Sequence, residues 1–154
     1  MHNCYHLDTQ LQDGRLSLLI DPGAWTNLIG EKLARSLSIR ALQHGHKPSQ
    51  DRMTNPLKTA GVGHGHHDCE WQIRCPIAVS SSEGNEHHTL LHELVAPVVR
   101  GAGAELPGLL GLRSLENHRA ILDTGGRKLL FPGPGDVEII LPLGSLVVPL
   151  HISP

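Results

Sequence analysis

Asp21 stands in the stretch LSLLIDPGAWTNLIG (residues 16–30), where an apolar run ends at an acid, turns through Pro-Gly and continues as a second apolar run. A carboxylate placed between a buried strand and a tight turn has little positional freedom, which suits a group that must meet a substrate in one orientation. A simple polar turn has the same composition, because Asp, Pro and Gly are all typical turn residues. Asp21 is therefore a candidate catalytic acid or base, and other motifs in the sequence must distinguish this role from that of a simple turn residue.

The residues after Asp21 fit a tight active-site turn. Gly23 permits backbone torsions and close approaches that a Cβ would forbid, and Ala24 is small enough to pack beneath the turn. Trp25 could line a cleft, although a large apolar side chain more often belongs to the core.

A second triplet of this type, Asp123-Thr124-Gly125, occurs in AILDTGGRKLL. An acid and a threonine followed by two glycines are typical of a hairpin turn. The apolar pair and the helical pattern that follow Asp21 are missing after Asp123. The sequence therefore predicts that Asp123 lies in a hairpin turn and that Asp21 is the functional carboxylate.

A cluster of possible metal ligands gathers within six residues, consisting of His64, His66, His67 and Cys69. Histidine and cysteine bind zinc and copper, but structural zinc takes four ligands in separated pairs. A solvated loop rich in histidine is therefore favoured, and no metal site is predicted. A small metal-binding β-protein stays as a lesser alternative.

The elements that position these residues are read from apolar periodicity and turn residues. The sequence predicts a hairpin through Asp13-Gly14 into residues 15–20, a short helix within 30–39, a polar surface connection over 40–56, and a long hairpin of strands 57–62 and 69–79 with a Gly/His-rich tip. It further predicts a strand over 87–99 with an edge or bulge at Pro97, a strand end leading into a short helix over 109–118, a hairpin over 119–131 and two strands within 137–150.

Length and charge limit the classes of function. A chain of 154 residues fits one domain, with a core over about residues 5–132 and a C-terminal strand pair over 133–154. The net charge of -2 and the scattered basic residues give no footprint for nucleic acid or an anionic membrane. No apolar window is long enough to cross a membrane, and no secretory leader is recognisable. Three cysteines without zinc-ribbon spacing favour reduced thiols. We therefore expect an intracellular, cytoplasmic protein.

Three motifs occur in one order: an acid-containing turn after a strand, a glycine-bearing hairpin, and an apolar-apolar-glycine segment before a helix. In this order the chain resembles the retropepsin-like aspartic proteases of retroviruses and retrotransposons, over roughly residues 5–132. The matching positions are Asp21-Pro22-Gly23-Ala24, the hairpin around Gly61-Val62-Gly63, and Leu109-Leu110-Gly111. If the resemblance holds, Asp21 ends a core strand beside Leu109 to Gly111.

The resemblance implies a mostly β, closed barrel-like sandwich with a flap hairpin and one or two short helices. It also implies a symmetric homodimer in which Asp21 of each subunit supplies one carboxylate of a dyad that hydrolyses an extended peptide or polyprotein, without a metal ion or cofactor. An alternative within the same fold is a catalytically inactive dimerisation or peptide-binding module.

Pro22 is the main departure from the family pattern. At this position the family has Thr or Ser, whose hydroxyl and backbone N–H join a hydrogen-bond lattice between the two active-site turns of the dimer. Proline offers neither group. Each lost bond costs about 1 kcal/mol net, so Pro22 is expected to weaken the dimer or the precision of the dyad.

Overall fold

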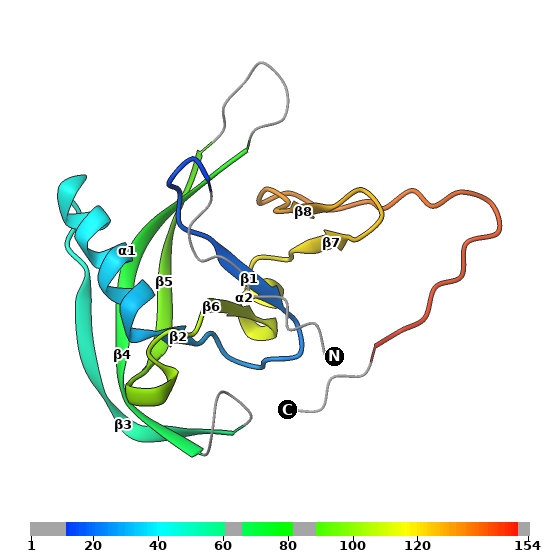
Figure 1. The fold of residues 1–154 in the computed structure, drawn as a ribbon. Helices are drawn as coiled ribbons and strands as arrows, with labels where there is room; N and C mark the ends of the chain where they lie inside the picture. Colours follow the sequence, from blue (N-terminus) through cyan, green and yellow to red (C-terminus); the bar gives the residue numbers. More distant parts are fainter. Residues whose placement is uncertain (1–11, 61–65, 82–88, 151–154) are drawn as a thin grey trace. The chain divides into compact units, whose positions relative to one another are not determined.

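The computed structural model describes residues 12–60, 66–81 and 89–150 (Figure 1). The chain forms two compact units, residues 1–117 and 118–154. The first strand of the predicted N-terminal hairpin and the predicted flap residues Gly61, Val62 and Gly63 lie outside the described residues.

A parallel pair of short strands lies at the centre of the first unit. β1 (Leu18–Asp21) pairs with β6 (Gly108–Gly111) in register from Leu18 opposite Gly108 to Asp21 opposite Gly111. A tight turn follows β1, whereas α2 (Leu112–Asn117) begins directly after β6. The strand end and short helix predicted over 109–118 are confirmed.

A four-stranded sheet makes up most of the first unit, in the order β2-β5-β4-β3. Its strands are β2 (Ile29–Gly30), β3 (Ser49–Ala60), β4 (His66–Ser80) and β5 (Thr89–Val99). β2 runs parallel to β5, and the other two pairings are antiparallel. Pro97 lies where β5 has a strand partner on one side only, because β2 pairs just with Val98 and Val99. Proline lacks the N–H that a second partner would need.

The prediction of a polar surface connection over 40–56 is wrong for much of its length. α1 (Glu31–Gln43) continues four residues beyond the predicted helix, and β3 begins at Ser49. The helix ends in two bonds typical of a Schellman motif, from Gly45 N to Leu42 O at 3.0 Å and from His46 N to Ala41 O at 2.9 Å. Gly45 adopts a φ of 79°, which only glycine accepts readily.

α1 packs on the four-stranded sheet and closes the main core. The buried side chains of this core are Ile29, Leu33, Ala34, Ala41, Ile73, Cys75, Leu94, Ala96 and Val98. A smaller cluster of Leu28, Cys69 and Val99 adjoins Leu109. Leu28 and Leu109 exchange backbone hydrogen bonds, from Leu28 N to Leu109 O at 3.2 Å and from Leu109 N to Leu28 O at 2.7 Å. This bridge ties the chain after the Asp21 turn to β6.

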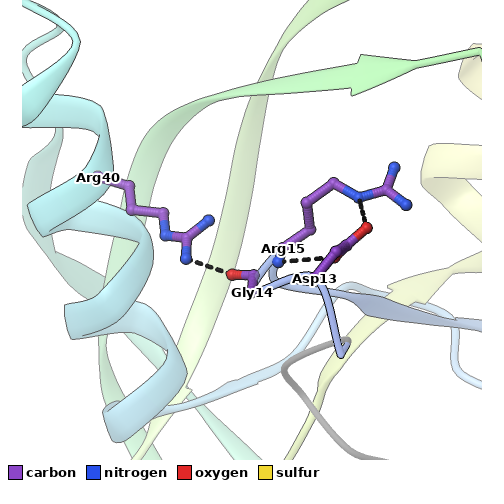
Figure 2. A network of polar contacts seen from close by, with 4 residues as sticks. All are labelled: Asp13, Gly14, Arg15 and Arg40. Atoms are coloured by element: carbon purple, nitrogen blue, oxygen red, sulfur yellow. Dashed lines mark hydrogen bonds and ion pairs between the residues drawn. The ribbon is translucent and has the colours of Figure 1, made fainter.

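A polar network connects the turn that precedes β1 to α1 (Figure 2). Arg40 of α1 donates a hydrogen bond to the carbonyl of Gly14, whose φ is 83°. The Asp13 carboxylate accepts from Arg15 N at 3.0 Å and from Arg15 Nε at 2.7 Å. Both bonds hold the pKa of Asp13 below its usual value, and the bond from the Arg15 backbone N–H has the larger effect. The predicted turn at Asp13-Gly14 is therefore an anchor for the strand that carries Asp21.

The second unit contains the predicted hairpin of β7 (Ile121–Asp123) and β8 (Lys128–Leu130). The predicted C-terminal strand pair is wrong for the described residues, because 131–150 contain no strand. Pro142 to Ser145 form a turn closed by Ser145 N on Pro142 O at 3.2 Å, with Gly144 at a φ of 88°. The apolar runs on both sides of the turn have β propensity, but they find no partner strand among the described residues.

The fold is mostly β, as predicted, but it is not a closed barrel in the described part of the chain. The described strands form three separate sheets, of two, four and two strands. Among the described strands β3 pairs with β4 alone, so the four-stranded sheet has an open edge in this part of the chain. None of the described helices is long and apolar enough to span a membrane.

Candidate active site

Asp21 is a half-buried residue at the carboxyl end of β1, and the turn after it is built on its own polar atoms. Gly23 N donates to Asp21 Oδ1 at 3.0 Å, and Ala24 N donates to the Asp21 carbonyl at 3.1 Å. Pro22 and Gly23 are exposed at the tip of the turn. Proline suits this position because its fixed φ matches the first central residue of such a turn. The turn therefore forms without the N–H and hydroxyl that Pro22 lacks.

Gly23 is needed for close approach rather than for an unusual torsion. Its φ does not lie in the left-handed region, so the expected backbone freedom is not used. A Cβ at Gly23 would lie 3.2 Å from Asp21 Oδ1. A side chain here would press on the carboxylate that the turn positions.

The segment Leu109 to Gly111 lies beside Asp21, as expected from the resemblance. Asp21 and Gly111 are opposite each other in the parallel pair. Two further bonds hold the start of α2 to the residues after the Asp21 turn, from Leu112 N to Ala24 O at 2.7 Å and from Arg113 N to Trp25 O at 3.1 Å. The two strand ends and the segments after them thus form one backbone framework.

Gly111 is buried where two chain segments touch. A Cβ at this position would lie 2.5 Å from Thr26 O and 2.9 Å from Ala24 O, and Ala24 O already accepts a hydrogen bond from Leu112 N. Only glycine allows β6 to approach the segment after Asp21 this closely.

Asn27 is a positioning residue that the sequence patterns did not single out. It is the buried polar residue of this region, with 8% of its surface exposed. Asn27 Oδ1 accepts from Gly111 N at 2.9 Å, and Asn27 Nδ2 donates to Val95 O at 2.9 Å. One side chain thereby links β6, which ends beside Asp21, to β5 of the larger sheet. A lone Asn within the apolar run TNLIG is the signal that could have indicated it.

Asp123 lies in the turn of the β7–β8 hairpin, as predicted. It is exposed, and its Oδ1 accepts from Gly126 N at 2.8 Å. The turn thus uses the Asp123 carboxylate as an ordinary turn acceptor within the second unit.

The cysteines and histidines form no metal centre within residues 12–60, 66–81 and 89–150. Cys69 and Cys75 are buried free thiols. Burial raises the pKa of both, because removal from water penalises the thiolate. They are core residues rather than nucleophiles.

The two tryptophans occupy different environments. Trp25, directly after the Asp21 turn, is 48% exposed and is not a core residue. Trp71 on β4 is half-buried and lies under the Arg100 guanidinium, 6.0 Å from the ring centroid.

Comparison with known protein families, curated proteins and solved structures finds no match to this chain. The framework around Asp21 therefore carries the functional interpretation.

Proposed function

We propose that this chain is an aspartic endopeptidase of the retropepsin type, active as a homodimer in which each subunit supplies Asp21. The observation that supports it is the pairing of Asp21 with Gly111 at the ends of two parallel strands, with the turn after Asp21 bonded to the start of α2. A half-buried carboxylate on such a framework has a fixed position and an open side, as a catalytic acid or base needs.

The proposed reaction requires two carboxylates that share one proton. One carboxylate takes a proton from the attacking water while the other donates a proton to the carbonyl oxygen of the peptide bond. Since the described part of the first unit offers a single acid in this setting, a symmetric dimer supplies the second one. The substrate is an extended peptide, and the hairpin of β3 and β4, between which Gly61, Val62 and Gly63 stand in the sequence, has the flap role.

Cleavage of a peptide mixture by purified protein tests this function. Asp21→Asn is expected to abolish cleavage and to leave the fold intact, because the amide keeps the shape of the carboxylate but cannot take the proton. The matched control is Asp123→Asn, which changes a turn acceptor in the second unit and should leave the rate unchanged. The rate should also fall as the pH rises, because the dyad loses its shared proton. Equal rates for Asp21→Asn and the parent chain would contradict the proposal.

Pro22 favours a second candidate, a catalytically inactive dimerisation or peptide-binding module of the same fold. Its missing hydroxyl and N–H remove two groups that the family uses to join the active-site turns. Sedimentation and cleavage separate the candidates: the module dimerises or binds peptide without turnover, whereas the peptidase also cleaves.

A further inference from the structure

An open groove lies between α1 and the four-stranded sheet, on the first unit. It encloses about 540 Å³, a size typical of ligand sites. α1 forms one wall, from Glu31 to Ile39, and the first residues of β3 form the other. Ile73 and Val98 of the sheet line its floor. Neither Asp21 nor any residue of its turn lines the groove.

One end of the groove is basic. Arg35 and Arg100 both approach Glu31, with Arg35 Nη2 at 2.9 Å and Arg100 Nε at 3.8 Å from Glu31 Oε1. The hydrogen bond from Arg35, more than any other contact, holds the pKa of Glu31 below its usual value, so this acid is ionised. Two guanidinium groups therefore face one carboxylate, which leaves one positive charge unneutralised.

The guanidinium groups at this end keep donors that Glu31 does not use. The Arg35 side chain is 75% exposed and that of Arg100 is 52% exposed, whereas that of Glu31 is 27% exposed. A guanidinium presents five N–H donors, and Arg100 is already held over the Trp71 ring. A ligand carboxylate can therefore reach oriented donors without displacing Glu31. The positive end of the α1 dipole lies at the same place and favours an anion further.

The other end of the groove carries one large exposed apolar side chain. Ile39 is 56% exposed there, although it lies on the helix that covers the core. Glu31 and Ile39 are eight residues apart, a rise of about 12 Å along the helix at 1.5 Å per residue, which matches three to four residues of extended peptide at about 3.3 Å each. Gln50 lines the opposite wall, and its side-chain amide can bond to a peptide backbone.

We propose that this groove binds an extended peptide of a partner protein in which an acidic residue stands next to two or three aliphatic residues. The acid lies against Arg35 and Arg100, and the aliphatic side chains lie along the groove towards Ile39, which is the exposed apolar residue of its lining. Charge complementarity fixes the end of the groove at which the acidic residue lies, because Arg35 and Arg100 are the basic residues of its lining. The site is separate from Asp21 and does not depend on proteolysis.

Fluorescence anisotropy with the full chain tests the site. The probe is fluorescein-Gly-Glu-Val-Ile-Val-amide, and the reference probe carries Gln in place of Glu. We expect the reference probe to bind about tenfold more weakly, because it loses charge-assisted hydrogen bonds. Added salt should weaken binding of the acidic probe more than binding of the reference probe.

Substitutions in the groove distinguish the contributions of its two ends to peptide binding. Arg35→Gln and Arg100→Gln should each weaken the acidic probe about tenfold and leave the reference probe nearly unchanged. Ile39→Ser should weaken both probes by the same factor, because it removes an apolar contact that they share. The matched control is Arg52→Gln, since Arg52 is an exposed arginine of β3 paired with Glu70 and lies outside the groove.

Three results would overturn the proposal: no binding of either probe, equal affinity for both probes, or equal weakening by Arg52→Gln and by the two groove arginine variants. All variants change exposed side chains, so each should fold, and circular dichroism checks this before binding is measured.

Discussion

Asp21 and Gly111 lie opposite each other at the carboxyl ends of β1 and β6, although the turn and α1, β3, β4 and β5 separate them in the chain. The position of the carboxylate is therefore set by backbone pairing between distant segments. Any change that separates β6 from the segment after Asp21 should disturb both the fold and the site.

Gly111→Ala is expected to destabilise the protein by about 2 kcal/mol, the usual cost of forcing extra atoms into a packed region. The added Cβ would lie 2.5 Å from Thr26 O and 2.6 Å from Thr26 C, and backbone cannot move aside as a flexible side chain can. Urea unfolding measures the cost. Gly133→Ala is the matched control, because a Cβ there meets no atom within 4 Å, and its stability should match the parent chain.

Asn27→Ala should cost about 3 kcal/mol, since it leaves the N–H of Gly111 and the carbonyl of Val95 without their partner. Asn27→Asp is the informative companion variant, because it keeps the acceptor for Gly111 N but removes the donor to Val95 O. Thermal and urea unfolding should show that the parent chain is more stable than Asn27→Asp. If Asn27→Ala unfolds at the same urea concentration as the parent, the side chain does not link the two sheets.

Cys75 should make stability fall at alkaline pH. Burial raises the pKa of its thiol above the ordinary value of 9.0 in the folded chain. The folded state therefore holds this proton more tightly than the unfolded state. The resulting stability is fully present below about pH 9 and is lost as the pH rises through the folded pKa.

Cys75→Ala removes this titration. The variant should lose some packing stability at every pH, and its unfolding free energy should fall less steeply above pH 9 than that of the parent chain. Urea unfolding at a series of pH values measures both slopes. An identical alkaline slope in the two proteins would show that the thiol does not titrate on unfolding.

Elements with a local chemical signal were predictable from the sequence. Asp-Pro-Gly marked the turn after β1, and Gly125-Gly126 marked the β7–β8 hairpin. The first part of β3 was missed because SQDRMTNP is polar and becomes a strand only through its pairing with β4, whereas the strand predicted from residue 57 overlaps the end of β3. The strands expected within 137–150 are absent from the described residues for the opposite reason, since β-prone residues form a strand only with a partner.

Only the parts of the site that have a local sequence signal were predictable. The turn residues and Gly111 follow sequence motifs, whereas the role of Asn27 depends on contacts with β5 and β6 that no local pattern encodes. The groove beside α1 is also a tertiary feature, because its lining comes from α1, β3, β4 and β5.

Pro22→Thr tests whether the active-site turn has lost contacts between subunits. Within one chain the variant gains nothing, because the bonds that close the turn use Gly23 N, Ala24 N and the two Asp21 acceptors. It also loses the fixed φ that restricts the unfolded turn, so the folded chain should be destabilised by about 0.4–1 kcal/mol. Urea unfolding at low protein concentration measures this effect by itself.

Pro22→Thr should strengthen dimerisation, although it destabilises the single chain, if the two active-site turns form the hydrogen-bond lattice of the retropepsin-like family. Each Thr hydroxyl and N–H then regains a partner across the dimer axis, worth about 1 kcal/mol net per bond, so Pro22→Thr dimerises more tightly and cleaves faster through a better-held dyad. Sedimentation and peptide cleavage on both proteins measure this. Lower stability combined with unchanged or weaker association would show that the turn is built around proline, and it would favour the inactive module over the peptidase.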